Sequence, residues 1–99
     1  MNISKTLNGT SMTIALEGRL DTSTAPELEE VVMENVDKIT ALTLDFEKLS
    51  YISSAGLRVL LNTHKLLSEK DGLKLIHVGD VTREVFDVTG FSDILTIEE

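Results

Sequence analysis

The alternation of apolar and polar residues near the N-terminus predicts a β-hairpin. Apolar side chains alternate with polar or small ones, the period of a half-buried strand, at Met12, Ile14 and Leu16. Asn8-Gly9 precedes this run, and this pair tolerates the positive φ angles of a type I′ turn. We therefore expect strands over 3–7 and 11–17, with Gly18 ending the second strand and a polar connection over 19–23.

Helical spacing begins after this connection. Thr24 is positioned to cap a helix, with Glu27 reaching back three residues later in a capping box. The apolar residues that follow at helical spacing are Leu28, Val31, Val32 and Val36. Two further strands are expected over 39–46 and 73–78, and a turn over 47–53 follows the first of them. The second of these is apolar on both faces, which is typical of a strand in the middle of a sheet.

Two more helices are predicted in the second half of the chain. One runs from about Ser54 to Glu69, with Gly72 closing it, and its predicted buried stripe is Leu57, Leu60, Leu61, His64 and Leu67. The other is capped by Asp80 and ends at Gly90, and its apolar residues are Val81, Val85, Phe86 and Val88. A short helical turn over 91–95 and an edge strand at 96–97 complete the pattern.

The element order β-β-α-β-α-β-α predicts an α/β domain over residues 1–99. We expect a mixed sheet of about four to five strands covered by three to four helices. The expected core residues are Leu42, Leu44, Leu57, Leu60, Leu61, Leu75, Ile76 and Phe86. A chain of 99 residues is long enough for one hydrophobic core and too short for two.

Composition narrows the classes of function. Nine basic and seventeen acidic residues give a net charge of −8, the wrong sign for binding a phosphate backbone, so we expect no direct nucleic-acid partner. The absence of cysteine excludes disulfides and thiolate chemistry. The sequence lacks the long apolar run of a membrane span or secretory signal. We therefore expect a cytoplasmic protein with no membrane partner.

Catalytic and cofactor-binding patterns are scarce. His64 and His77 lie on different predicted elements, and we interpret both as structural residues, with no metal-ligand spacing among the acidic and histidine side chains. The acidic residues are interpreted as a solvated surface. Neither G-x-x-x-x-G-K-[ST] nor G-x-G-x-x-G occurs, so we expect no nucleotide site. The sequence thus predicts no catalytic residue, no metal and no cofactor.

Two adjacent hydroxyl residues, Ser53 and Ser54, stand where a turn becomes the second helix. Ala55 and Gly56 follow at once, and such small residues leave a hydroxyl exposed and let another backbone approach. A nucleophilic serine is excluded because G-x-S-x-G is absent and no histidine is positioned as a base. One interpretation is a helix cap. The other is a phosphate acceptor, because a helix N-terminus stabilises about −1.5 to −2 added charges. From these residues alone both interpretations remain open.

Four segments in order resemble the STAS family, the fold shared by anti-sigma factor antagonists and the cytoplasmic tails of sulfate transporters. Gly18-Arg19-Leu20-Asp21 matches the family's G-x-L-D, and 44–49 matches its strand and turn. Residues 52–57 match the D-S-[STA]-G-L region, and 86–91 match F-x-x-x-G-[LF]. Within this family the chain resembles a free-standing bacterial anti-sigma factor antagonist, also called an anti-anti-sigma factor.

This resemblance implies a regulatory protein that is not an enzyme. Its unphosphorylated form would bind an anti-sigma factor that is also a serine kinase, which frees a sigma factor for transcription. Phosphorylation by that kinase would break the complex, and a serine phosphatase would restore it. The family's acceptor serine falls on Ser54. The partner-binding residues expected from this resemblance are Asp21, Thr22, Ser23, Thr24, Ser53, Ser54, Ala55, Gly56, Arg58 and Asn62.

The chain departs from the family pattern at Ser53, where aspartate is usual. A second hydroxyl here makes Ser53 an alternative, less favoured acceptor. It also supports a rival hypothesis, a non-phosphorylated STAS scaffold subunit of a transporter or signalling complex. Side-chain size further predicts that Gly56→Val damages partner binding more than folding, because Gly56 is expected on an exposed platform beside the hydroxyl.

Overall fold

Within residues 1–98, the part of the chain that the computed structural model describes, five strands form one mixed sheet in the order β1-β2-β3-β4-β5. The strands are β1 (Asn2–Asn8), β2 (Ser11–Leu20), β3 (Ala41–Ile52), β4 (Gly72–Ile76) and β5 (Thr96–Glu98). Only β1 and β2 pair antiparallel, and each later neighbour pairs parallel. Parallel neighbours need a crossover connection, which the helices between them provide.

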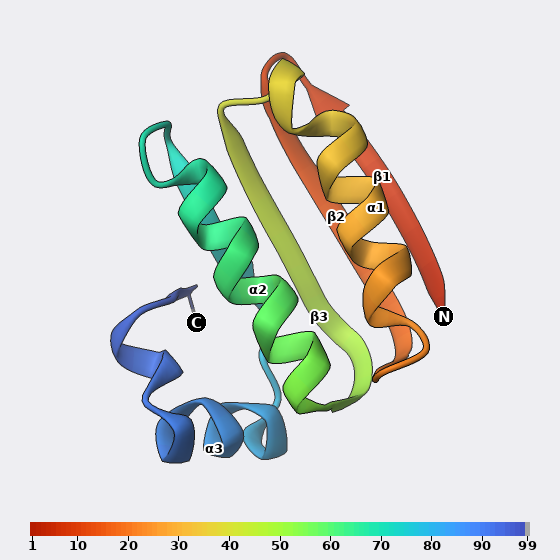
Figure 1. The fold of residues 1–99 in the computed structure, drawn as a ribbon, viewed down its shortest axis with the longest axis vertical. Helices are drawn as coiled ribbons and strands as arrows, with labels where there is room; N and C mark the ends of the chain where they lie inside the picture. Colours follow the sequence, from red (N-terminus) through yellow and green to blue (C-terminus); the bar gives the residue numbers. More distant parts are fainter. Residues whose placement is uncertain (99) are drawn as a thin grey trace.

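Three α-helices and two 3₁₀ turns alternate with the strands of residues 1–98. They are α1 (Ala25–Asn35), η1 (Val36–Lys38), α2 (Ser54–Leu67), α3 (Asp80–Thr89) and η2 (Phe91–Asp93). In Figure 1, α1 and α2 lie side by side over one face of the sheet, with α3 running across one end of it. The predicted α/β class and the numbers of strands and helices are confirmed.

The core lies between the helices and the face of the sheet that they cover. Ile14, Leu44 and Leu75 are register neighbours on β2, β3 and β4, and each is 0% exposed. Phe86 of α3 packs against Phe46 of β3, with ring centroids 6.3 Å apart. The helices thereby bury the strand residues that alternate with polar ones in the sequence.

Six of the eight predicted core residues are buried, and two are not. The buried ones are Leu42, Leu44, Leu57, Leu60, Leu75 and Phe86. Leu61 lies on the flank of α2 and is only half-buried, as is His64 from the same predicted stripe. Ile76 is half-buried because it alternates with Leu75 and so points to the sheet face away from the helices. On α3, Val81 and Val88 are exposed.

β2 and β3 are both longer than the sequence pattern predicted. β2 does not end at Gly18 but continues to Leu20, and β3 continues through the predicted turn to Ile52. The extensions pair with each other, Leu20 opposite Ile52, after register shifts on either side of Gly18. Gly18 has a φ of +113°, which glycine adopts at little cost, so it produces an irregularity in the strand instead of ending it.

Several other turn and helix boundaries differ from the predicted ones. Asn8 pairs with Ser11, so Gly9 and Thr10 are the central turn residues, and only Gly9 has a positive φ, at +66°. The predicted type I′ turn at Asn8-Gly9 is therefore wrong, although the hairpin itself is confirmed. α2 ends at Leu67, and α3 is capped by Gly79 with Asp80 as its first helical residue. β4 lies inside the sheet but next to the short edge strand β5.

Candidate phosphorylation and partner-binding site

The ends of β2 and β3 bring the two predicted binding segments together. The backbone N–H of Ser53 donates a 2.9 Å hydrogen bond to the carbonyl of Leu20. Because β2 and β3 are parallel, the loops that leave their carboxyl ends emerge at the same edge of the sheet. Residues 21–24 and 53–56, which are distant in the sequence, therefore form one surface at the start of α2.

Ser53 and Ser54 have different positions in this surface. Ser53 is the N-cap of α2, and its hydroxyl accepts a long 3.5 Å hydrogen bond from the Gly56 N–H. Ser54 is the first residue of α2 and is exposed, and within residues 1–98 its hydroxyl has no hydrogen-bond partner. The first turn of α2 also carries no acidic residue. The Ser54 hydroxyl is thus accessible and lies at the positive end of α2, where no acidic side chain balances the helix dipole.

Gly56 does not form the exposed platform that the sequence predicted. It is buried in α2, and a Cβ atom there would lie 2.8 Å from Cγ of Leu20 and 2.9 Å from Cγ1 of Ile52. Both distances are shorter than a real Cβ atom tolerates. The exposed platform behind the expectation that Gly56→Val damages partner binding more than folding is therefore wrong, because Gly56 allows α2 to approach the ends of β2 and β3. Ala55 beside it is half-buried.

The segment 21–24 is held together by hydrogen bonds around Asp21. Its carboxylate accepts from the Ser23 hydroxyl at 2.8 Å and from the N–H groups of Ser23 and Thr24 at 3.0 and 3.2 Å. The hydrogen bond from the Ser23 hydroxyl, supported by these N–H groups, lowers the pKa of Asp21 and keeps it ionised. Thr22 and Ser23 are exposed, which leaves them accessible to a partner.

Thr24 stabilises this loop instead of capping α1. It occupies the N-cap position, but its side chain forms no cap hydrogen bond. Its hydroxyl donates to the Arg19 carbonyl at 2.7 Å and accepts from the Asp21 N–H at 2.8 Å. The predicted capping box with Glu27 is therefore wrong, because the extended end of β2 supplies nearer partners for the hydroxyl.

Arg58 and Asn62 continue the candidate surface along α2. Both are exposed, and they follow Ser54 at intervals of four residues, which places the three side chains along one side of the helix. Every predicted binding residue except Gly56 is thus at least partly accessible in this region of the fold.

Sequence reasoning missed an aromatic and a basic residue beside this surface. The Arg19 guanidinium lies 4.1 Å from the centroid of the Tyr51 ring, and its Nε is 3.7 Å from a carboxylate oxygen of Asp21. Tyr51 is 41% exposed. Arg19 belongs to the G-x-L-D segment, but Tyr51 lies in the predicted turn. The sequence therefore did not indicate that Tyr51 pairs with Arg19 across the sheet.

Acidic and histidine residues show no metal-ligand spacing along the sequence, but the fold brings three of them together. His77 Nδ1 lies 2.9 Å from Asp45 Oδ1 and 3.6 Å from Glu47 Oε2, so the three groups have the spacing of a metal-ligand set. His77 directly follows β4, and Asp45 and Glu47 lie on the adjacent strand β3. The Asp-x-Glu spacing of Asp45 and Glu47 is the only signal in the sequence, since His77 is distant along the chain.

These contacts shift the pKa of both partners. The hydrogen bond with Asp45 raises the pKa of His77, and the charges of Asp45 and Glu47 add to this effect. Partial burial raises the pKa of Asp45, but the hydrogen bond from the Glu47 N–H and the contact with His77 outweigh it, so the net shift is downward. The pair is thus most stable with His77 protonated and Asp45 ionised.

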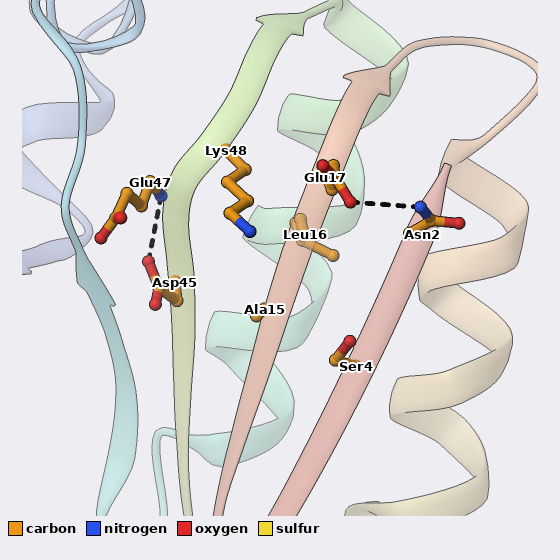
Figure 2. A pocket seen from close by; sticks show the side chains of 8 residues that line it. All are labelled: Asn2, Ser4, Ala15, Leu16, Glu17, Asp45, Glu47 and Lys48. Carbon is orange, nitrogen blue, oxygen red and sulfur yellow. Dashed lines mark hydrogen bonds between the residues drawn. The ribbon is translucent and has the colours of Figure 1, made fainter.

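Asp45 and Glu47 also line a hollow of about 240 Å³ on the sheet face that carries no helix (Figure 2). Lys48, Glu17, Asn2 and Ser4 line it as well, and the Asn2 amide donates a 3.1 Å hydrogen bond to Glu17. α2, the helix that begins at Ser54, covers the opposite face of the sheet (Figures 1 and 2).

In the described part of the chain, no helix is both long and apolar enough to span a membrane.

The family model described as the STAS domain matches residues 2–99. The chain therefore belongs to the STAS family, as its four motifs and its five-stranded sheet indicated. The anti-sigma-B factor antagonist of Staphylococcus aureus (strain NCTC 8325 / PS 47) is 32% identical over 101 aligned residues, which cover 100% of this chain and 94% of that protein.

Solved anti-sigma factor antagonists share the fold. One from Mycobacterium paratuberculosis is 25% identical, with a TM-score of 0.87 over 97% of this chain and 83% of that one. Unphosphorylated SpoIIAA is 20% identical, with a TM-score of 0.79 over 99% of this chain and 88% of that one. Phosphorylated SpoIIAA of Bacillus has a TM-score of 0.77 at 20% identity, over 99% and 92% of the two chains.

Proposed function

We propose that this protein is an anti-sigma factor antagonist that is switched by phosphorylation of Ser54. Its unphosphorylated form binds an anti-sigma factor that is also a serine kinase, and this binding frees a sigma factor for transcription. The observation that carries this proposal is the exposed Ser54 hydroxyl on the first residue of α2, beside the loop 21–24. The regulatory role of the family relatives supports it.

The switch needs no catalysis by this chain. The partner kinase supplies ATP, the bond between Ser54 Oγ and the γ-phosphorus forms as the bond to the ADP oxygen breaks, and a base of the kinase takes the hydroxyl proton. A separate serine phosphatase hydrolyses the phosphoserine and restores the first state. Because the kinase uses ATP, we expect the protein to act in the cytoplasm.

The added charge explains why the complex dissociates. An interface that fits a neutral hydroxyl must desolvate a phosphate carrying about −1.5 to −2 charges, which costs several kcal/mol unless the partner supplies matching cations. The fold is expected to survive, because Ser54 is exposed and the positive end of α2 favours an anion there. Phosphorylation therefore changes the surface without unfolding the domain.

Ser53 has a supporting role in this proposal. Its hydroxyl is turned to the Gly56 N–H, and its backbone is bonded to Leu20, so it is less accessible to a kinase than Ser54. The residue that replaces the family's usual aspartate thus caps the helix as an uncharged acceptor.

Phosphosite mapping on wild type, Ser53→Ala and Ser54→Ala with one kinase preparation tests the assignment. We expect phosphate in wild type and Ser53→Ala and none in Ser54→Ala, which should bind the kinase constitutively. Phosphate that persists in Ser54→Ala and disappears in Ser53→Ala would reverse the assignment. Tight kinase binding without phosphate in any of the three proteins would instead support the constitutive scaffold.

A further inference from the structure

Arg58 is the one arginine without an acidic partner in residues 1–98. The chain has three arginines: Arg19 lies 3.7 Å from Asp21, and Arg83 lies 3.5 Å from Asp87. Arg58 is exposed and forms no ion pair within this part of the chain. This isolation is unexpected in a protein with seventeen acidic residues, and it occurs on the helix that begins with Ser54.

Arg58 lies one helical turn after Ser54 on α2. Residues four apart on a helix are neighbours on its surface, and helical side chains tilt toward the N-terminus. A side chain as long as that of Arg58 can therefore reach the turn that contains Ser54. The planar guanidinium matches phosphate oxygens with two parallel hydrogen bonds, which lysine cannot do.

The other charged groups near this turn do not compete for Arg58. Asp21 is already engaged by Ser23, Thr24 and Arg19. The first turn of α2 contains no acidic residue. In the unphosphorylated protein Arg58 is thus available to a partner, and the nearest new anion after modification would be the phosphate itself.

We propose that Arg58 is the intramolecular ligand of the phosphate on Ser54. Pairing with the phosphate withdraws Arg58 from the partner-binding surface, so modification adds an anion and removes a cation in one step. An acidic group of the partner that contacts Arg58 in the first complex then loses its counter-charge. This inference rests on the proposed function, because it takes Ser54 as the acceptor.

The test introduces phosphoserine at position 54 during biosynthesis, which requires no kinase, and follows the second phosphate pKa by ³¹P NMR. We expect this pKa to be lower by about half a unit or more in wild type than in Arg58→Gln, because a nearby cation favours the dianion. The matched control is Lys65→Gln, which removes one positive charge from an exposed residue near the other end of α2. It should leave the pKa unchanged.

Two further comparisons make the result specific. Arg58→Lys should retain only part of the shift, because the lysine keeps the charge but not the paired donors. Phosphoserine at position 53 should respond less to Arg58→Gln, since it is not four residues from Arg58. Equal pKa values in wild type and Arg58→Gln, or equal responses at positions 53 and 54, would overturn the pairing. Neither result depends on whether the kinase modifies Ser54, so failure here is distinguishable from failure of the proposed function.

Discussion

Gly56 and Leu20 are packed so closely that a Cβ atom on Gly56 would lie 2.8 Å from Cγ of Leu20. Leu20 is 0% exposed and cannot move away without disturbing the core. This contact joins the end of β2 to the first turn of α2, the two elements that carry the candidate surface. The position of Ser54 therefore depends on a glycine two residues later.

Replacing Gly56 should destabilise the fold. We expect Gly56→Ala to lower the free energy of unfolding by about 1–3 kcal/mol, although alanine is the better helix former, because the methyl group overpacks the site. Gly56→Val should cost more. Gly79→Ala is the control for the added methyl group, because nothing lies within 4 Å of its Cβ and its cost is limited to the less favourable N-cap residue of α3. Urea titrations measure all three, and wild-type stability in Gly56→Ala would contradict the packing argument.

Removing the Thr24 hydroxyl should loosen the loop 21–24. Thr24→Ala loses hydrogen bonds to Arg19 and Asp21, and we expect a loss of about 1–2 kcal/mol in the free energy of unfolding. Thr24→Ser keeps the hydroxyl and should recover most of it. Thr22→Ala, at an exposed position, should stay within about 0.5 kcal/mol of wild type. Equal losses in Thr22→Ala and Thr24→Ala would contradict the assigned bonds.

A negative charge at Ser54 should weaken partner binding without destabilising the fold. Ser54→Glu places an acid in the empty first turn of α2, so we expect its stability to be unchanged or higher by about 0.3–1 kcal/mol. Its affinity for the proposed partner kinase should fall, but by less than phosphorylation would lower it, because one carboxylate has less charge and fewer acceptor oxygens than a phosphate. Asn62→Glu, in mid-helix, should lack the stabilising effect. Thermal melts and calorimetric titration measure the two quantities, and a destabilised Ser54→Glu would show that charge acts through unfolding.

The His77–Asp45 pair should make stability depend on pH. The pKa of His77 is raised above its ordinary 6.5, so its contribution is fully present below that value and is lost as pH rises through the folded-state pKa. His77→Asn keeps a residue that tolerates the observed φ of +55° but cannot be protonated. The difference in melting temperature between wild type and His77→Asn should therefore decrease as the pH rises from about 6 to about 9.

Asp45 provides the control for this pH dependence. Asp45→Asn removes the main hydrogen-bond partner of His77, so it should abolish most of the change in melting temperature between pH 6 and pH 9. Because both groups are partly exposed, high salt should weaken the effect as well. If Asp45→Asn has the same pH profile as wild type, the His77–Asp45 pair does not cause the pH dependence of stability.

The sequence alone determined the class of fold and the start of α2. These features are local: the alternation at Met12, Ile14 and Leu16 and the helical spacing after Ser54 report which side chains share a buried face. The αL conformation of Gly90, with a φ of +84°, ends α3 where the pattern expected it. Such signals lie within a few residues of one another, so they can be read along the chain.

Tertiary structure alone decided the features that depend on distant partners. Leu20 and Ile52 continue their strands because each supplies the neighbour that the other lacks, and only this pairing buries Gly56 between them. His77 meets Asp45 and Glu47 because β4 lies beside β3. A periodic pattern shows which face of a strand is buried, but it does not show which strand lies alongside. The packing role of Gly56 and the acid–histidine cluster therefore arise from strand order and register, which the whole chain sets together.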